Sequence, residues 1–432
     1  MVRKMMTYLM QWKGSPYRKP LILQGARQVG KTYSILAFGR EQYENVAYFN
    51  FETSPLLAKT FDENISPSYL IPLLSRIAGQ TIIKEKTLIV FDEVQLCERA
   101  LTSLKYFCED APEYHIIVAG SLLGVAVNRG KFSFPVGKVD MKTLLPMDME
   151  EFLIANGEEE LVAQIKNCFA NNTPLPVALH DAALAYYRQY LVVGGMPECV
   201  EKYLATKDFI LLRHIQTMIL ESYLKDMSKY NVTNEIKKTQ LVYDNITVQL
   251  SKKNTRFQYK LMQQGARAAA FENAIEWLVL SGIVTRIQRV ERPAKPLENY
   301  RDIDAFKIYV SDAGLLCAKK DVVAEDVLYD TGEINDFKGG MTENYVCAQL
   351  AANEYRSYYW MSERGGAEVD FVIQRGGKVI PIEVKSAENT KAKSLAVYIA
   401  AYAPEYAIKL CTKNFGFEDG KKTVPLYAAF CI

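Results

Sequence analysis

The stretch LILQGARQVGKTYSIL, residues 21–36, constrains this chain more than any other segment. A short apolar strand runs into a loop with the spacing G-x-x-x-x-G-K-[ST], and a helix begins within the same motif. Gly25 and Gly30 permit backbone conformations that a Cβ would obstruct, so successive N–H groups can face a phosphate. The helix that begins near Lys31 adds the positive end of its dipole. The pattern predicts a phosphate-binding loop at the end of a strand.

Two side chains of this motif would make the direct contacts to a bound nucleotide. Lys31 would reach the β- and γ-phosphates as a point charge, and the Thr32 hydroxyl would ligate Mg²⁺. The alternative is an ordinary glycine-containing turn between a strand and a helix. The predicted nucleotide-contacting residues are Gly25, Ala26, Arg27, Gln28, Val29, Gly30, Lys31, Thr32 and Tyr33.

A second segment supports the nucleotide interpretation. Residues 87–95, TLIVFDEVQ, form an apolar strand that ends in two adjacent carboxylates, about 60 residues after the glycine-rich loop. Asp92 would hold Mg²⁺ through water, and Glu93 would polarise the attacking water as a general base. On its own, Asp-Glu after an apolar run is a common end to a strand. Together the two segments predict binding and hydrolysis of a nucleoside triphosphate.

Composition places few further limits on the chain. Its 432 residues predict two or three domains, and a formal net charge of +2 gives no global nucleic-acid signal. Eight cysteines without a CxxC pair and three histidines argue against structural zinc and a disulfide scaffold, and favour a reducing compartment. We find no signal-peptide pattern and no run of 18 apolar residues, so we expect a cytoplasmic protein without a membrane partner.

From residue 20 to about 150, apolar strands alternate with helical stretches, which predicts a parallel sheet with helices on both faces. Ligands of such sheets lie at the carboxyl ends of the strands. Ser121 follows the strand YHIIVAG and would contact the γ-phosphate or orient the attacking water. A serine that caps the next turn is the alternative.

Residues 146–226 look helical and contain Gly194-Gly195-Met196-Pro197. This sequence is either a turn between two helices or a lid element that faces the nucleotide. The residues alone leave both interpretations open.

The next region is basic. Between Arg213 and Arg267 there are ten Lys and Arg against four Asp and Glu. Helical segments 236–251 and 266–281 are followed by two expected strands, 282–290 and 305–316, in the order of a winged helix. Such a module binds DNA, with basic residues on the phosphates, or else it binds proteins. The candidate DNA contacts are Lys252, Lys253, Arg256, Lys260 and Arg267.

The last hundred residues contain a D-x₁₂-E-x-K pattern on two expected strands. Glu383 and Lys385 share one strand face, and Asp370 lies on the preceding strand. Two carboxylates that hold a divalent ion, with a lysine that stabilises the attacking water, suit metal-assisted hydrolysis of a phosphodiester. Glu343, on the preceding helix, is a further candidate ligand. Solvated charges on an exposed hairpin are the alternative.

Together these segments resemble one family. GARQVGKT, LIVFDEVQ, AGSLLGV, FPVGKVDMKTLLPMDMEEFL, YLVVGGMPECV and the terminal AEVDFVIQ…IPIEVKS occur in the order found in prokaryotic, archaeal-type AAA+ ATPases with a C-terminal domain of unknown function. The resemblance implies an α/β fold with four parts, and ATP with Mg²⁺ as cofactors. The parts are an AAA+ P-loop core (1–150), a helical lid (151–226), a winged helix (227–330) and a restriction-endonuclease-like PD-(D/E)xK domain (331–432).

The resemblance also implies roles for single residues. Lys31 and Thr32 match the Walker A motif, Asp92 and Glu93 match Walker B, and Ser121 matches sensor 1. The lid signature GGxP corresponds to residues 194–197. The nuclease-like triad, with a second Mg²⁺ or Mn²⁺, corresponds to Asp370, Glu383 and Lys385.

The chain departs from the family at one position. Many members read FPVGR where this chain has Lys138, and lysine is a poorer planar donor than arginine. If that arginine serves as a finger on a neighbouring subunit's nucleotide, Lys138 or the nearby Arg129 would replace it, in a homo-oligomer.

Three functions follow from these expectations. The first is an ATP-binding and ATP-hydrolysing switch, cycling between ATP and ADP, that is coupled to a DNA-binding winged helix. The second is an ATP-regulated endonuclease that cuts with the C-terminal site. The third is a signalling or scaffold ATPase whose other modules bind protein partners.

Overall fold

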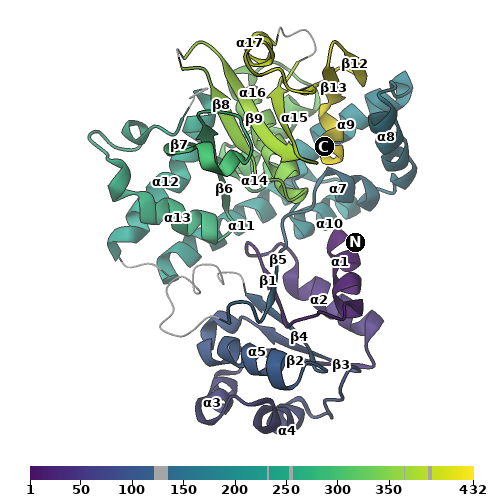
Figure 1. The fold of residues 1–432 in the computed structure, drawn as a ribbon, viewed down its shortest axis with the longest axis vertical. Helices are drawn as coiled ribbons and strands as arrows, with labels where there is room; N and C mark the ends of the chain where they lie inside the picture. Colours follow the sequence, from purple (N-terminus) through teal and green to yellow (C-terminus); the bar gives the residue numbers. More distant parts are fainter. Residues whose placement is uncertain (121–134, 231–232, 253–255, 364, 388–391) are drawn as a thin grey trace. The chain divides into compact units, whose positions relative to one another are not determined.

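The computed structural model describes residues 1–432 except 121–134, 231–232, 253–255, 364 and 388–391. The described chain divides into two compact units (Figure 1). The P-loop unit comprises Val2–Leu145 with Leu280–Gly282. The second unit comprises Met1, Pro146–Val279 and Ile283–Ile432.

The P-loop unit is built on a five-stranded sheet with the order β2-β3-β4-β1-β5. Every neighbouring pair is parallel, which confirms the sheet predicted from the alternating strands and helices. The register aligns Asn50 with Asp92 and Gln24 with Gly120, so the carboxyl ends of four strands meet at one edge. The strands are β1 (Leu21–Gln24), β2 (Asn45–Asn50), β3 (Thr87–Asp92), β4 (His115–Gly120) and β5 (Asp140–Thr143).

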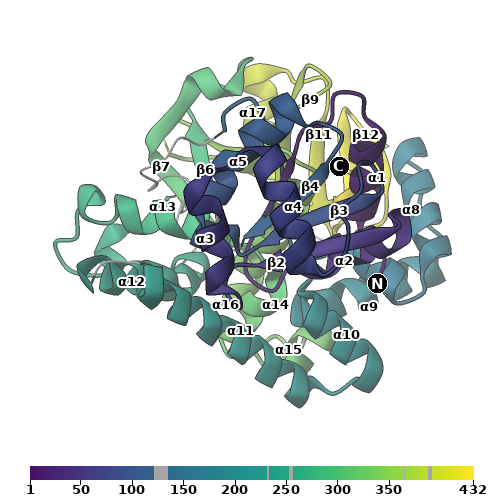
Figure 2. The same cartoon turned by 90° about the horizontal axis from the view of Figure 1, so that it is seen from below.

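Helices cover both faces of this sheet because its inner strands β3 and β4 are buried at every position. Phe49 and Phe91 form a buried cluster with residues of α3, α4 and α5, the helices seen in Figure 2. Toward the other face, Gly39 of α2 packs closely on Val46 and Leu88. The helices are α1 (Lys4–Gly14), α2 (Lys31–Gln42), α3 (Pro55–Glu63), α4 (Pro67–Ala78) and α5 (Glu98–Asp110).

The second unit begins with helices, as predicted for residues 146–226.

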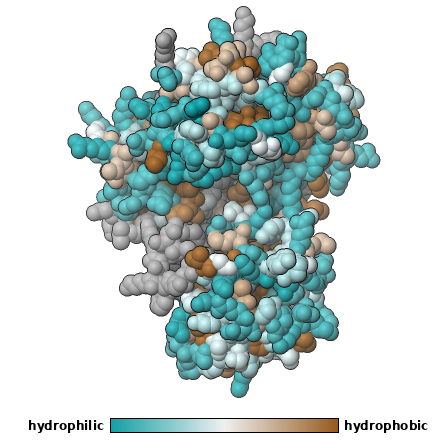
Figure 3. Space-filling model, viewed as in Figure 1, coloured by the Kyte–Doolittle hydropathy of each residue, from teal (hydrophilic) through white to brown (hydrophobic). Residues whose placement is uncertain are grey.

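None of the helices in the described part of the chain is both long and apolar enough to cross a membrane. On the face in Figure 3, apolar side chains are scattered among hydrophilic ones. The helices up to residue 280 are α7 (Met149–Ala155), α8 (Glu159–Asn171), α9 (Val177–Val193), α10 (Pro197–Thr206), α11 (Phe209–Tyr230), α12 (Thr233–Ser251) and α13 (Glu272–Leu280).

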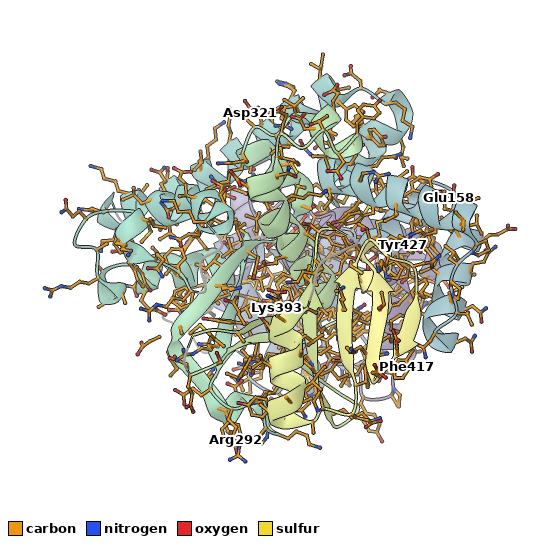
Figure 4. All side chains as sticks on the ribbon, turned by 90° about the horizontal axis from the view of Figure 1, so that it is seen from above. Glu158, Arg292, Asp321, Lys393, Phe417 and Tyr427 are labelled. Atoms are coloured by element: carbon orange, nitrogen blue, oxygen red, sulfur yellow. The ribbon has the colours of Figure 1, made fainter. Side chains whose placement is uncertain are left out.

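An eight-stranded sheet with the order β12-β13-β11-β10-β9-β8-β6-β7 forms the rest of the second unit. Tyr427, labelled in Figure 4, follows this sheet and joins it to α9 through a 2.8 Å hydrogen bond to His180. The strands are β6 (Val284–Val290), β7 (Arg301–Val310), β8 (Tyr358–Met361), β9 (Glu368–Arg375), β10 (Lys378–Val384), β11 (Ala407–Cys411), β12 (Gly416–Glu418) and β13 (Lys421–Pro425). The helices beside it are α14 (Ala313–Lys319), α15 (Ala324–Leu328), α16 (Asn335–Ala352) and α17 (Lys393–Tyr402).

The hairpin expected as the wing of a separate module belongs to this sheet. Strand β6 pairs in parallel with β8, from Gln288 opposite Tyr358 to Val290 opposite Trp360. The second wing strand also ends earlier than expected, because the Asp312 side chain accepts the Leu315 N–H and starts α14 at Ala313. Local sequence predicts that a strand forms, but its partner depends on the tertiary fold.

The Gly194–Pro197 turn has a packing role within the second unit. The Gly195 N–H donates to Asp312 over 2.6 Å, and the Gly195 carbonyl accepts the Met147 N–H over 2.7 Å. A Cβ at Gly195 would lie 1.9 Å from the Met147 carbonyl oxygen. Gly194 has φ +75°, which favours glycine. The contacts found for this turn are those of a tight connection between helices.

Gly195→Ala should therefore destabilise the second unit, because its methyl group meets backbone that cannot move aside. We expect a loss of about 1–3 kcal/mol in the free energy of unfolding, measured by chemical denaturation. Gly339→Ala, in α16 of the same unit, is the matched control, since nothing lies within 4 Å of its Cβ position. Equal stability of the two variants would contradict this packing role.

Candidate functional site

The glycine-rich loop in the P-loop unit has the backbone of a phosphate cradle. Gly25, Gln28 and Gly30 all have positive φ, at 144°, 65° and 90°. Gly25 also lies against the end of β5, where a Cβ would come within 2.2 Å of the Leu144 carbonyl oxygen. The first glycine is thus required for close approach as well as for conformation. The buried Lys31 ammonium donates to the carbonyls of Gly25 and Ala26, at 2.8 and 2.7 Å, and so lies within the loop.

Asp92 connects the loop to the neighbouring strand ends. This carboxylate is 5% exposed and accepts the Thr32 hydroxyl over 2.8 Å. The Tyr48 hydroxyl donates to the same oxygen over 2.7 Å, and the Glu93 N–H donates to the other oxygen over 3.0 Å. The two Mg²⁺-directed groups predicted from the sequence, Thr32 and Asp92, are therefore in direct contact.

Glu93 is held in an unusual backbone conformation at the end of β3. Its φ is +51°, a left-handed value that non-glycine residues adopt mainly where the surroundings impose it. Burial raises the pKa of Glu93 above its ordinary value, while a hydrogen bond from the Gln95 side chain opposes this rise. A carboxylate with a raised pKa at this edge is suited to general-base chemistry.

The residues present fit Mg²⁺ and a nucleoside triphosphate. Hydroxyl and carboxylate oxygens are the ligands that Mg²⁺ prefers, and Thr32 and Asp92 place one of each side by side. The positive-φ loop and the N-terminus of α2 supply N–H groups for phosphate oxygens. Bound Mg²⁺ would supply neutralisation of phosphate charge.

Two residues of β2 lie at this edge of the sheet but were not predicted as site residues from the sequence. Tyr48 bonds Asp92 directly, and Asn50 donates to the Tyr48 hydroxyl over 3.2 Å. They stand two apart on one strand, so their side chains share a face. The available signal was this polar pair near the carboxyl end of a strand in an α/β sheet, where ligand sites are found.

Three further candidate residues complete the account of this unit. Ser121 and Arg129 lie outside the described residues. The Lys138 ammonium forms an ion pair with Glu109 over 2.9 Å. The role of Lys138 as a substitute finger stays a prediction.

Removing the hydrogen bond to Glu93 should change the pH dependence of ATP hydrolysis. Gln95→Ala takes away a donor that stabilises the ionised carboxylate, so the pKa of Glu93 should rise further. If Glu93 is the predicted general base, it acts only when ionised, so the acid limb of kcat should move to higher pH, as measured by phosphate release across a pH series. Gln80→Ala, which removes a donor to the Val46 carbonyl elsewhere in the unit, is the control. An unmoved acid limb would contradict the role of Gln95.

The second unit contains a cavity of about 400 Å³ where the C-terminal site was predicted. Glu343, Asp370 and Lys385 line it, as expected, together with Glu368 and Lys307. Burial and the neighbouring Glu343 raise the pKa of Asp370 to about 8. The remaining lining residues are Gln249, Leu250, Arg256, Phe257, Ile308, Tyr309, Gly339, Val384, Ser386 and Ser394.

Glu383 is not among the residues that line this cavity, so its place in the predicted metal triad stays a prediction. It is 2% exposed, accepts the Leu395 N–H over 2.9 Å, and pairs with Lys385 over 2.6 Å. Asp370 instead accepts the Val384 N–H over 2.7 Å. Within the described part of the chain, no group of three or more His, Cys, Asp or Glu is arranged to hold a metal ion. The residues as placed do not fit a second divalent cation.

The Lys307 side chain supplies positive charge to the carboxylates of this cavity. It is 9% exposed, forms an ion pair with Glu368, and lies 3.6 Å from Glu343. Burial alone would lower the pKa of Lys307, but Tyr309 and the surrounding carboxylates raise it well above its ordinary value. Sequence reasoning missed Lys307 and Glu368. The available signals were a lone lysine in the strand AFKIYV and a glutamate two residues before Asp370.

Lys307→Met should destabilise the second unit by about 1–3 kcal/mol, because it removes the buried ammonium that pairs with the partly buried carboxylates of Glu343 and Glu368. If the ammonium occupies a cation position, Mn²⁺ should raise the thermal midpoint of this variant and leave the wild type unchanged. Lys319→Met is the matched control, since the Lys319 side chain is equally buried but pairs with the single carboxylate Asp244. A similar response of both variants to Mn²⁺ would contradict this interpretation.

The candidate DNA contacts lie partly on this cavity. Phe257 stacks on Phe306 of β7, with ring centroids 5.5 Å apart, and its N–H donates to the Phe306 carbonyl. Arg256, the residue before Phe257, lines the cavity together with Lys307. Lys253 lies outside the described residues. The exposed candidates are Lys252, Arg256, Lys260 and Arg267.

Three family profiles match the chain. Residues 17–153 match an AAA domain, residues 184–326 match a domain of unknown function (DUF8612), and residues 338–429 match another (DUF4143). No curated protein matches. The chain therefore contains a P-loop ATPase domain of the AAA type, which confirms the first part of the expected resemblance.

Solved structures offer distant likenesses. A Walker-type ATPase of Pyrococcus abyssi is 16% identical with a TM-score of 0.45, over 74% of this chain and 95% of that one. The ORC2 protein of Aeropyrum pernix is 12% identical with a TM-score of 0.34, over 76% and 91%. The ORC1 protein of the same organism, in complex with DNA, is 12% identical with a TM-score of 0.28, over 77% and 92%.

Proposed function

We propose that this chain is an ATP-dependent switch, in which the P-loop unit binds and hydrolyses ATP and thereby controls a DNA-binding surface on the second unit. The direct contact between Thr32 and Asp92, with Glu93 as the next residue, carries the ATPase part of the proposal. It brings together the three oxygen-bearing side chains that Mg²⁺ and the attacking water require.

Each residue has a distinct task in this proposal. Lys31, within the loop, exchanges its carbonyl partners for the β- and γ-phosphates. Thr32 and Asp92 hold Mg²⁺, with Tyr48 fixing the Asp92 carboxylate from the side of β2. Glu93 accepts the proton of the attacking water, and its buried position favours the protonated product of that step.

The ATPase part is tested by two substitutions. Lys31→Ala should abolish ATP binding, because it removes the cation inside the loop. Glu93→Gln should keep ATP binding and lower hydrolysis roughly 10²–10⁴-fold, since it removes the base but preserves its shape. Fluorescent-nucleotide binding and phosphate release separate the two effects. Glu44→Gln, an exposed carboxylate paired with Lys86, is the control. Wild-type hydrolysis by Glu93→Gln would overturn the assignment.

DNA binding is supported by charge and by placement. The region from Arg213 to Arg267 carries a formal net charge of +6, from ten basic and four acidic residues. Four of its candidate DNA-contacting residues are exposed, and Arg256 immediately precedes Phe257, which stacks on Phe306. Exposed arginine and lysine side chains suit contacts to DNA phosphates.

Neutralising Lys252, Arg256 and Lys260 together should weaken DNA binding and reduce its salt dependence. The slope of log K against log[salt] should fall by about 0.9 for each B-DNA phosphate that the variant no longer neutralises, as measured by fluorescence anisotropy. A variant neutralised at Lys59, Lys84 and Lys86 is the control, because both triple variants change the formal net charge from +2 to −1. Equal slopes in the two variants would favour the scaffold alternative, in which the second unit binds proteins.

We do not propose the endonuclease alternative. Among the described residues, no group of three or more His, Cys, Asp or Glu is arranged to hold the divalent ion that cleavage needs. Glu383 pairs with Lys385 and accepts the Leu395 N–H. The four-part domain division, the cytoplasmic location and the homo-oligomer stay predictions.

A further inference from the structure

We propose that Arg3 is a positioning residue for nucleotide binding, which holds the last peptide of the phosphate-binding loop in its binding orientation. Arg3 lies outside every motif identified above and immediately precedes α1. Its side chain is nevertheless 6% exposed. One guanidinium nitrogen donates to the Val29 carbonyl over 3.1 Å, and the other donates to the Leu145 carbonyl over 2.7 Å.

The bond to Val29 controls the direction of a neighbouring N–H group. In a trans peptide the carbonyl of one residue and the N–H of the next point in opposite directions. Because Arg3 draws the Val29 carbonyl toward itself, the Gly30 N–H points away from Arg3. Gly30 has φ +90° and is the cap residue of α2, and a glycine has no side chain to limit its backbone conformation. Arg3 therefore supplies a restraint that the glycine itself lacks.

The bond to Leu145 joins the loop to the end of β5. Leu144 donates its N–H to the Gln24 carbonyl over 2.8 Å, and its own carbonyl packs against Gly25. The segment 144–145 thus contacts the first glycine of the loop, while Arg3 connects it to the residue before the last glycine. A planar guanidinium can donate to two separate carbonyls at once, whereas a lysine ammonium is a single point charge on a flexible stem.

This inference rests on the proposed nucleotide binding. It assigns Arg3 no direct contact with the phosphates. Arg3 stabilises the complex with bound ATP by keeping the Gly30 N–H oriented toward the phosphates, and it contributes equally before and during the chemical step. Its removal should raise the Kd and the KM for ATP and leave kcat nearly unchanged. A merely structural role would lower stability without separating KM from kcat.

The experiment compares Arg3→Met, Arg3→Lys and Arg18→Met in the full chain. Arg18 is a matched control, since it also donates to two backbone carbonyls of the same unit, those of Lys13 and Pro112, each over 3.1 Å. Arg3→Met removes both hydrogen bonds and should weaken ATP binding roughly 10-fold, about the effect of the charge-assisted bond to Val29 that orients the loop peptide. Arg3→Lys should lie between this variant and the wild type. Arg18→Met should bind ATP as the wild type does.

Each outcome decides the question. Wild-type Kd and KM in both Arg3 variants would overturn the inference and leave the proposed function standing. If Arg3→Met does not fold, Arg3→Lys decides by the same measurements. Failure of the wild-type chain to bind ATP would overturn the proposed function, and this inference with it.

Discussion

The hydrogen bond between Thr32 and Asp92 is the central contact of the candidate nucleotide site in the P-loop unit. It joins the first turn of α2 to the carboxyl end of β3, and Tyr48 adds the end of β2 through the same carboxylate oxygen. Parallel pairing makes this possible, because it aligns the strand ends at one edge of the sheet. Burial of the apolar sheet faces under helices leaves this edge as the place where polar side chains can gather. The phosphate loop, Thr32, Asp92 and Glu93 all lie at this edge because each is at or after the end of a strand.

In the second unit, the main electrostatic constraint is the repulsion between neighbouring carboxylates. Its cavity gathers carboxylates from α16 and β9, which would repel one another if left without counter-charge. Lys307, from β7, enters the same cavity and pairs with two of them. Strand β7 is present there because its hairpin belongs to the large sheet. The counter-charge of the C-terminal region is therefore supplied by a segment that local sequence assigned to a separate winged helix.

Buried polar contacts far from the motifs also shape the candidate sites. Arg3 reaches the phosphate loop from the first residues of the chain, and Asp312 holds the Gly194–Gly195 turn from the start of α14. Each replaces its hydration with hydrogen bonds to backbone N–H or carbonyl groups. Such residues carry no motif of their own, because a single buried charge has no periodicity or spacing that marks it.

The sequence by itself determined the phosphate loop, the Asp92–Glu93 pair, the parallel sheet and the helical region that follows it. Those features depend on local properties, namely glycine spacing, apolar runs and the alternation of strands with helices. The tertiary structure decided which carboxylate faces the C-terminal cavity. Asp370 and Glu383 look alike in the sequence, yet Asp370 lines the cavity while Glu383 is buried against Lys385 and the start of α17. It also decided the partner of the β6–β7 hairpin and the roles of Tyr48 and Lys307. These depend on contacts between residues distant in the chain, and only packing determines which distant side chains meet.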